Sequence, residues 1–143
     1  MIKVSIDTKP RDLRKMVQRL GRTFTKNHKV AMRRAAAEGV NRIQKRTSLG
    51  LDLHEQPFRP YSDAYKGFRQ SKGRPVDKVK LIFTGRMRGA MTSGLSGQDG
   101  LIFFSSRAES KKAAMNNRKR QFFGLNRKDT RAIRDVYFKG LKI

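Results

Sequence analysis

Residues 10–46 read PRDLRKMVQRLGRTFTKNHKVAMRRAAAEGVNRIQKR, and apolar or small side chains recur in them every three or four positions. This is the period of one face of an α-helix. Pro10 suits a first helical turn, where the N–H that it lacks would have no partner, and Asp7 or Thr8 is placed to cap that turn. We therefore predict a helical N-terminal third in which most cations point away from one stripe: Leu13, Val17, Leu20 and Phe24, continued by Ala31, Ala35, Gly39 and Ile43.

The number of helices in this segment stays open. Gly21 and the polar residues 23–27 can bend or break a helix, so one long helix and two shorter ones are both compatible with the sequence. Residues 35–37 are all alanine, and Gly39 follows them. Such a small-sided surface allows another helix or backbone to approach closely, either within the subunit or across an interface.

The segments on either side of this helical region have no helical period. Residues 2–6 alternate apolar and polar side chains, which predicts a short strand. From residue 48 to residue 79 glycine and proline recur at short intervals, and about thirty residues without a periodic signal are typical of a functional or disordered loop. Composition favours disorder for residues 66–78, whereas Pro57–Tyr61 favours an extended segment docked on another surface. We predict a long flexible loop at about residues 50–78.

The region after this loop predicts a small antiparallel sheet. Residues 79–84 alternate in the manner of a strand, and residues 101–104 are an apolar run that reads as a second strand. Between them, residues 96–100 (SGQDG) give a strong turn signal, so the two strands are expected to form a hairpin. The type of the short element at Met87–Met91 stays open.

The end of the chain predicts two further helices. Residues 109–117 have moderate helix propensity, and Asn126 with Asp129 three residues later resembles a capping box at a helix start. The whole chain, residues 1–143, is thus expected to form a single α+β domain, with N-terminal helices packed on a small antiparallel β-sheet, a long central loop and a C-terminal helix. The last helix has an apolar stripe of Ala132, Ile133, Val136 and Tyr137.

The composition narrows the classes of partner and of chemistry. The net charge is +24, cations are spread along the whole chain, and hydrophobic residues make up only 36%. Such a charge favours anionic partners, and so small a hydrophobic fraction leaves part of the stability to neighbouring subunits. There is no cysteine, which excludes disulfides and thiolate chemistry. No apolar run approaches the roughly 20 residues of a membrane span, so we expect no membrane partner and a protein made in the cytoplasm.

No arrangement of residues predicts catalysis or a bound cofactor. Asp52, His54 and Glu55 offer metal-ligand side chains within four positions, but a metal site needs three or four ligands that converge in space, and a surface cluster is the favoured interpretation. The remaining acids are scattered, and nucleophile-elbow and phosphate-loop motifs are absent from the sequence. We predict a protein that is not an enzyme and has no catalytic residues, no metal site and no cofactor.

Cations on the predicted N-terminal helix and at residues 118–123 (RKRQFF) are candidates for contact with a polyanion. The second cluster interleaves its cations with two aromatics, but Phe122 and Phe123 are more readily explained as core residues beside Leu125. Contact with DNA would then involve phosphates without base readout. The candidate polyanion-facing residues are Arg33, Arg34, Arg42, Lys45, Arg46, Arg118, Lys119 and Arg120.

Several segments, taken in order, are similar to one known family. The helical third is followed by PFRPYS at residues 57–62, LIFTGRM at 81–87, a glycine-rich hairpin, and RQFFGLN at 120–126 before a terminal helix. This order resembles the phage virion-morphogenesis family, the tail-completion proteins at the junction of head and tail, over residues 10–138. Patterns of the type Leu-x-x-Thr-Gly-x-Met and Arg-x-Phe-x-Gly-Leu recur there, and the matching residues are Thr84, Gly85, Met87, Arg120, Phe122, Phe123, Gly124, Leu125 and Asn126.

The resemblance implies a structural protein of the virion neck. It implies a homo-oligomeric ring, expected to be hexameric, around the DNA channel, with the tail terminator on one side and head-completion or connector proteins on the other. Genomic DNA in the channel is a further contact, and assembly would take place in the host cytoplasm. In a ring, a central loop can dock on the next subunit, which makes these residues interface candidates: Pro57, Phe58, Pro60, Tyr61, Tyr65 and Phe68.

A second hypothesis comes from the charge alone. A general, phosphate-contacting nucleic-acid-binding protein would also be small and basic throughout. It would display its cations on one continuous face and could act as a monomer. A neck protein would instead turn them toward acidic partners or a channel lumen, and would form a closed ring.

Overall fold

The computed structural model describes residues 10–82 and 84–141, with side chains from residue 14 onward. The strand predicted at residues 2–6 and the caps predicted at Asp7 and Thr8 lie outside this part. Within the described residues, five helices and one antiparallel pair of strands confirm the predicted α+β class. The element order is α1 (Pro10–Ser48), α2 (Asp63–Ser71), α3 (Arg86–Gly89), β1 (Met91–Ser96), β2 (Asp99–Phe104), α4 (Arg107–Lys119) and α5 (Arg127–Leu141).

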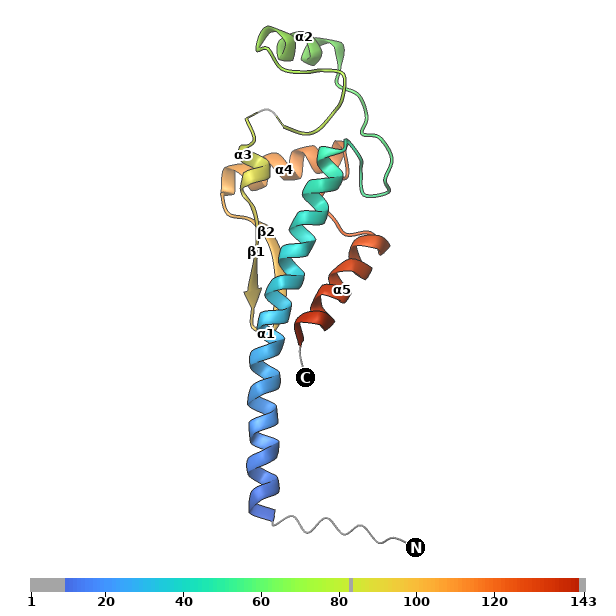
Figure 1. Ribbon diagram of the computed structural model, residues 1–143. Helices are drawn as coiled ribbons and strands as arrows, with labels where there is room; N and C mark the ends of the chain where they lie inside the picture. Colours follow the sequence, from blue (N-terminus) through green and yellow to red (C-terminus); the bar gives the residue numbers. More distant parts are fainter. Residues whose placement is uncertain (1–9, 83, 142–143) are drawn as a thin grey trace, which may run out of the picture.

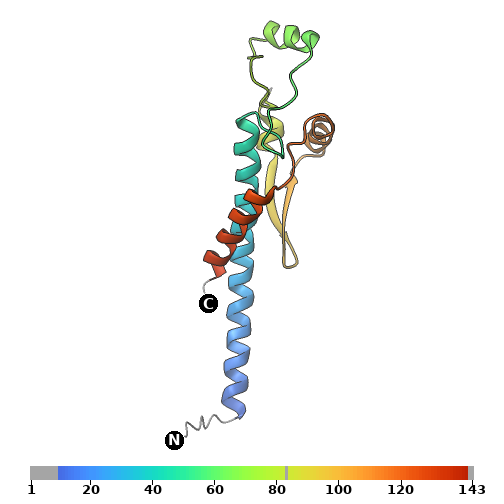
Figure 2. The ribbon, with the colours of Figure 1, turned by 90° about the vertical axis from the view of Figure 1, so that its right-hand side faces the viewer.

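Helix α1 is the axis on which the other elements are arranged. It is one continuous helix of 39 residues, so Gly21 does not interrupt it. The hairpin lies along one side of its second half and α5 along another, while α4 crosses near its C-terminal end (Figures 1 and 2). The first half of α1 extends beyond all these elements in both views. The molecule is therefore a small body with a long helical projection.

Small residues on α1 allow the hairpin and α5 to approach closely, as the small-sided surface at residues 35–39 predicted. A Cβ at Gly39 would lie 2.5 Å from the Ile102 side chain on β2, and one at Gly140 would lie 3.1 Å from the backbone of Ala31. Ala31 is fully buried beneath the end of α5. The small-sided surface of α1 is thus used within the subunit.

The sequence predicted the turn of the hairpin correctly, but it placed the first strand at the wrong residues. β1 pairs with β2 from Met91↔Phe104 to Ser96↔Asp99, leaving a two-residue turn in which Gly97 has φ +61. Glycine at the first central position is what a type II′ hairpin turn requires. The strand predicted at residues 79–84 is not found in the described part of that range, 79–82 and 84: Leu81 has φ +54, which no extended strand accommodates. Its alternation reflects the side chains of Val79 and Leu81 packing on the core instead.

The central segment predicted as a loop contains helix α2. Ser62 caps it by accepting a hydrogen bond from the Tyr65 N–H at 3.3 Å. The chain after it is held by Arg69, which is 4% exposed and donates to the carbonyls of Pro75 (3.0 Å) and Ile82 (3.2 Å). Helix α2 stands off from the rest of the body at the end opposite the α1 projection (Figure 1).

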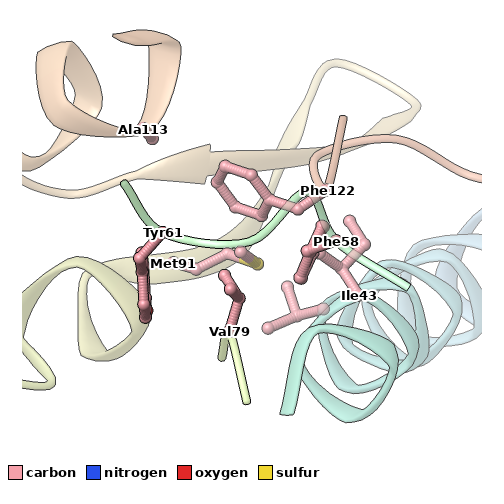
Figure 3. Packing of buried hydrophobic residues seen from close by; sticks show 8 residues of the cluster. Ile43, Phe58, Tyr61, Val79, Met91, Ala113 and Phe122 are labelled. Atoms are coloured by element: carbon pink, nitrogen blue, oxygen red, sulfur yellow. The ribbon is translucent and has the colours of Figure 1, made fainter. Parts of the chain in front are cut away.

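One compact cluster of apolar side chains joins these elements. Figure 3 shows α1 contributing Ile43, the central segment contributing Phe58 and Tyr61, and the segment before α5 contributing Phe122. Val79, Met91 and Ala113 complete the labelled set. Among the described residues, no helix combines the length and apolar character needed to cross a membrane.

The close packing at Gly39 yields a stability prediction. Replacing Gly39 by leucine forces a branched side chain against Ile102 and is expected to lower the free energy of unfolding by about 1–3 kcal/mol, because overpacking strains a dense core. The matched change Gly21→Leu places the same residue where a Cβ meets nothing within 4 Å, and should raise stability by up to about 1 kcal/mol through helix propensity. Urea unfolding at one protein concentration measures both, and equal shifts for the two variants would contradict the proposed packing.

Candidate interaction surfaces

Arg46 is buried and is bound on several sides by other parts of the chain. It is 6% exposed, its Nη1 donates to the Asp129 carboxylate, and its Nη2 donates to the carbonyls of Phe122 (3.1 Å) and Gly124 (2.7 Å). The prediction that Arg46 faces a polyanion is therefore wrong. A planar guanidinium with several donors can hold a carboxylate and carbonyls together, and here it joins α1 to α5 and to the segment before it.

The RQFFGLN segment owes its shape to this arginine and to a helix cap. The Asn126 N–H donates to Asp129 Oδ2 (3.1 Å), and the Asp129 N–H donates to Asn126 Oδ1 (2.9 Å), which confirms the predicted capping pair. Phe122 is 1% exposed and Phe123 packs on Phe104, so both enter the core as favoured. Leu125, in contrast, is exposed.

Arg120 also serves the fold. It donates from Nε to the Arg59 carbonyl (2.8 Å) and from Nη2 to the Pro60 carbonyl (3.0 Å), and its guanidinium lies 5.2 Å from the centre of the Tyr61 ring. Its side chain is thereby committed to the chain at residues 59–61. These contacts explain why Arg120 is one of the motif residues. They do not support its predicted role toward a polyanion.

The other candidate cations keep accessible charge. Arg42 pairs with Glu38 at 2.7 Å and is partly exposed. The remaining members are exposed and lie on the second half of α1 or at the end of α4: Arg33, Arg34, Lys45, Arg118 and Lys119.

The predicted interface residues divide into two groups. Phe58 and Tyr61 are 6% and 7% exposed and belong to the subunit's own core, so neither is free to meet a neighbour in this conformation. This corrects their prediction as interface residues, because the aromatic–proline segment docks on its own subunit. Pro57 and Pro60 are exposed, as are Tyr65 and Phe68, whose rings stack on α2 with centroids 6.0 Å apart.

A cavity of about 1040 Å³ opens between α2, the segment before α3 and α4. We call it the α2–α4 cavity. Thr84 and Gly85 of the Leu-x-x-Thr-Gly motif line it, and Gly85, at φ +82, begins α3 there. Five cationic residues line it, namely Arg59, Arg69, Lys112, Lys119 and Arg120. Apolar side chains form much of its wall: Tyr61, Tyr65, Leu81, Ile82, Met87 and Met115.

A buried carboxylate, Glu109, also lines this cavity. Glu109 is 7% exposed, and its Oε1 accepts a hydrogen bond from Lys112 at 2.9 Å. Its Oε2 is buried and has no hydrogen-bond partner among the described residues. A buried carboxylate oxygen without a donor is costly, so Glu109 is held in the structure against an energetic penalty. Ser106 caps α4, because its hydroxyl accepts a hydrogen bond from the Glu109 N–H at 3.5 Å, and this cap was not predicted from the sequence.

A second apolar surface lies on the projecting half of α1. Four of its side chains are about half exposed or more, at 56%, 60%, 57% and 49%. We call them the α1 stripe, which consists of Met16, Val17, Leu20 and Phe24.

The cluster at residues 52–55 is a turn. Asp52 Oδ1 accepts hydrogen bonds from the N–H groups of His54 (2.8 Å) and Gln56 (2.9 Å), and Glu55 pairs with Lys128 at 2.6 Å. Within the described ranges, no three acidic or histidine side chains gather in a way that could hold a metal ion.

Comparisons with known proteins give this chain no relative. No family model matches it, and neither a curated protein nor a solved structure does so. Its function therefore has to be argued from its own surfaces.

The buried pair of Arg46 and Asp129 yields the next prediction. The change Arg46→Gln is expected to cost about 3–5 kcal/mol of unfolding free energy, because Asp129 would remain buried without its partner. The matched change Arg42→Gln, on the same helix, breaks a more exposed pair and should cost less than about 1 kcal/mol. Thermal or urea unfolding of the two variants measures the difference, and comparable losses would show that the buried pair is no more important than the surface one.

Proposed function

We propose that this chain is a structural virion protein of a tailed phage, a tail-completion or neck component that acts by assembly and performs no catalysis. The observation that carries the proposal is the α1 stripe, a row of apolar side chains on a helix that projects beyond the subunit's own body. Apolar surfaces of this kind mark sites of association.

The motif order that resembles the tail-completion family supports the same proposal. Its RQFFGLN segment is built around Arg46 and positions α5, and its Thr-Gly pair starts α3 beside the α2–α4 cavity. These are structural roles, as expected for motifs that recur in an assembly protein. In this proposal, several copies form a ring between the tail and the head connector around the DNA channel.

The alternative, a general phosphate-contacting nucleic-acid-binding protein, is favoured by one further observation. On the projecting half of α1, Lys15, Arg19, Arg22, Lys26 and Lys29 fall within a sector of about 80°, at about 100° per residue. They form a cationic face that can follow a phosphate backbone. In a neck ring the same face would suit a channel that DNA passes through.

The neck proposal is tested by removing the gene from the phage or prophage that encodes it. We expect DNA-filled heads and separate tails in electron micrographs, with plaque formation reduced by at least a hundredfold and restored by the gene in trans. A point variant that folds but does not assemble serves as a control for the role of the protein itself. Normal, infectious particles without the protein would refute the neck role.

The alternative is tested by the salt dependence of duplex-DNA binding. The variant Arg22→Gln/Lys26→Gln removes two cations from the projecting face, and should flatten the slope of log K against log salt by about 0.9 for each phosphate that is no longer neutralised. Arg46→Gln is unsuitable as a control because it disturbs the fold, so Lys111→Gln with Lys139→Gln provides a change of equal charge at two exposed lysines outside the candidate set. No DNA binding by the wild type at low salt would end the alternative.

A further inference from the structure

Two largely exposed apolar surfaces lie on this chain, although Phe24 at the end of the α1 stripe stacks on His28 with ring centroids 6.2 Å apart. The α1 stripe lies on the first half of α1, and the α2–α4 cavity is lined by residues of α2 and α4. Figures 1 and 2 show α2 and α4 at the end of the molecule opposite the projecting half of α1. One is a convex row of side chains and the other is a hollow. Neither can reach the other in the same copy, because the length of α1 separates them.

The α1 stripe continues a face that already packs against protein. Further along α1, the same side of the helix carries Ala31 and Ala35, which are 0% and 2% exposed beneath the rest of the body. The stripe is where this packing face runs past the ends of α5 and of the hairpin. Continuity with an internal packing face favours a protein surface as its occupant.

The distribution of charge around α1 permits contact between like-charged copies. The centre of the cationic sector lies about 150° from the centre of the stripe, at about 100° per residue. The residues that flank the stripe include Thr23 on one side and Gly21 on the other, both uncharged. An apolar face with neutral flanks can approach the cations around the α2–α4 cavity without placing one cation against another. Two copies that each carry a net charge of +24 repel each other, so a contact between them has to avoid further pairs of like charges.

The α2–α4 cavity offers what this face needs. Its wall presents the side chains of Tyr65 and Met115, which are 39% and 67% exposed, and its volume of about 1040 Å³ exceeds that of the four stripe side chains.

We propose that the α1 stripe of one copy occupies the α2–α4 cavity of the next copy. The inference rests on the proposed function in that a ring is the assembly this contact would build. The contact is heterologous, because it joins two different surfaces and each copy carries one of each. Such a contact builds a closed ring when the rotation from one copy to the next divides a full turn evenly. The cationic face of α1 then stays outside the contact and is available to a polyanion.

The test uses the full-length chain after nuclease treatment, at about 0.5 M salt so that screening removes residual charge effects. Sedimentation velocity is expected to show an oligomer for the wild type. The stripe variant Val17→Gln/Leu20→Gln and the cavity variant Tyr65→Gln/Met115→Gln should each self-associate at least tenfold more weakly. Arg22→Gln/Lys26→Gln, which places the same residue on the cationic face, should assemble like the wild type.

The deciding measurement is an equimolar mixture of the stripe variant and the cavity variant. In this mixture the cavity variant supplies an intact stripe and the stripe variant supplies an intact cavity. We therefore expect a dimer of one stripe variant and one cavity variant, and no larger species. A mixture that stays monomeric overturns the proposal, as does a cavity variant that assembles normally. A wild-type chain that is monomeric at high concentration overturns it too, and binding of that monomer to anionic vesicles or to an acidic protein would then assign the stripe to that partner.

Folding is checked by circular dichroism, and Val17→Ala/Leu20→Ala replaces the stripe variant if glutamine disturbs the helix. The contact and the neck role fail separately. If the mixture of variants forms the dimer but phage particles assemble normally after gene deletion, the contact is supported and the neck role is refuted. If phage assembly fails after gene deletion but the mixture of variants forms no dimer, the neck role is supported and this contact is refuted.

Discussion

The rest of the structure depends on the guanidinium of Arg46. Taking a charged group out of water is expensive, and pairing the charge and using most of its donors offset that cost, although Arg46 Nε is buried without a partner among the described residues. Asp129 supplies the charge, and the carbonyls of Phe122 and Gly124 take two further bonds. Since these partners come from α5 and from the segment before it, one side chain on α1 sets where the last helix starts. The same contact keeps Phe122 in the core, at 1% exposure.

The fold uses arginine as a connector at two more places, and this changes what the charge of +24 means. Arg69 and Arg120 each donate to two backbone carbonyls of segments without regular structure. Such segments have carbonyls that no helix or sheet satisfies, and a guanidinium offers several donors in a fixed plane. In a chain with few hydrophobic residues, these bonds hold loops that a larger core would otherwise cover. Part of the positive charge is therefore structural, and the charge alone overstates how much of the surface faces a polyanion.

The features that the sequence predicted correctly are those that depend on residues close together in the chain. The helical period gave α1, and Asn126 with Asp129 gave the start of α5, because both depend on near neighbours in the chain. The strand expected at residues 79–84 was wrong because alternation also arises where side chains anchor an irregular segment, and Leu81 has a positive φ. The α2–α4 cavity was not predicted, since it joins segments about fifty residues apart, and the burial of Glu109 leaves no trace in its immediate sequence.

The projecting half of α1 combines two properties that usually conflict. An isolated helix is marginally stable in water, and most helical stability comes from packing an apolar face. Here the apolar face is bare over the length of the α1 stripe, while α1 continues without a break from the packed half. The packed half therefore nucleates the exposed half. A cationic face on the opposite side adds no apolar burial and keeps the bare helix from pairing indiscriminately with other copies. The arrangement stabilises a helix whose remaining burial has to come from another molecule.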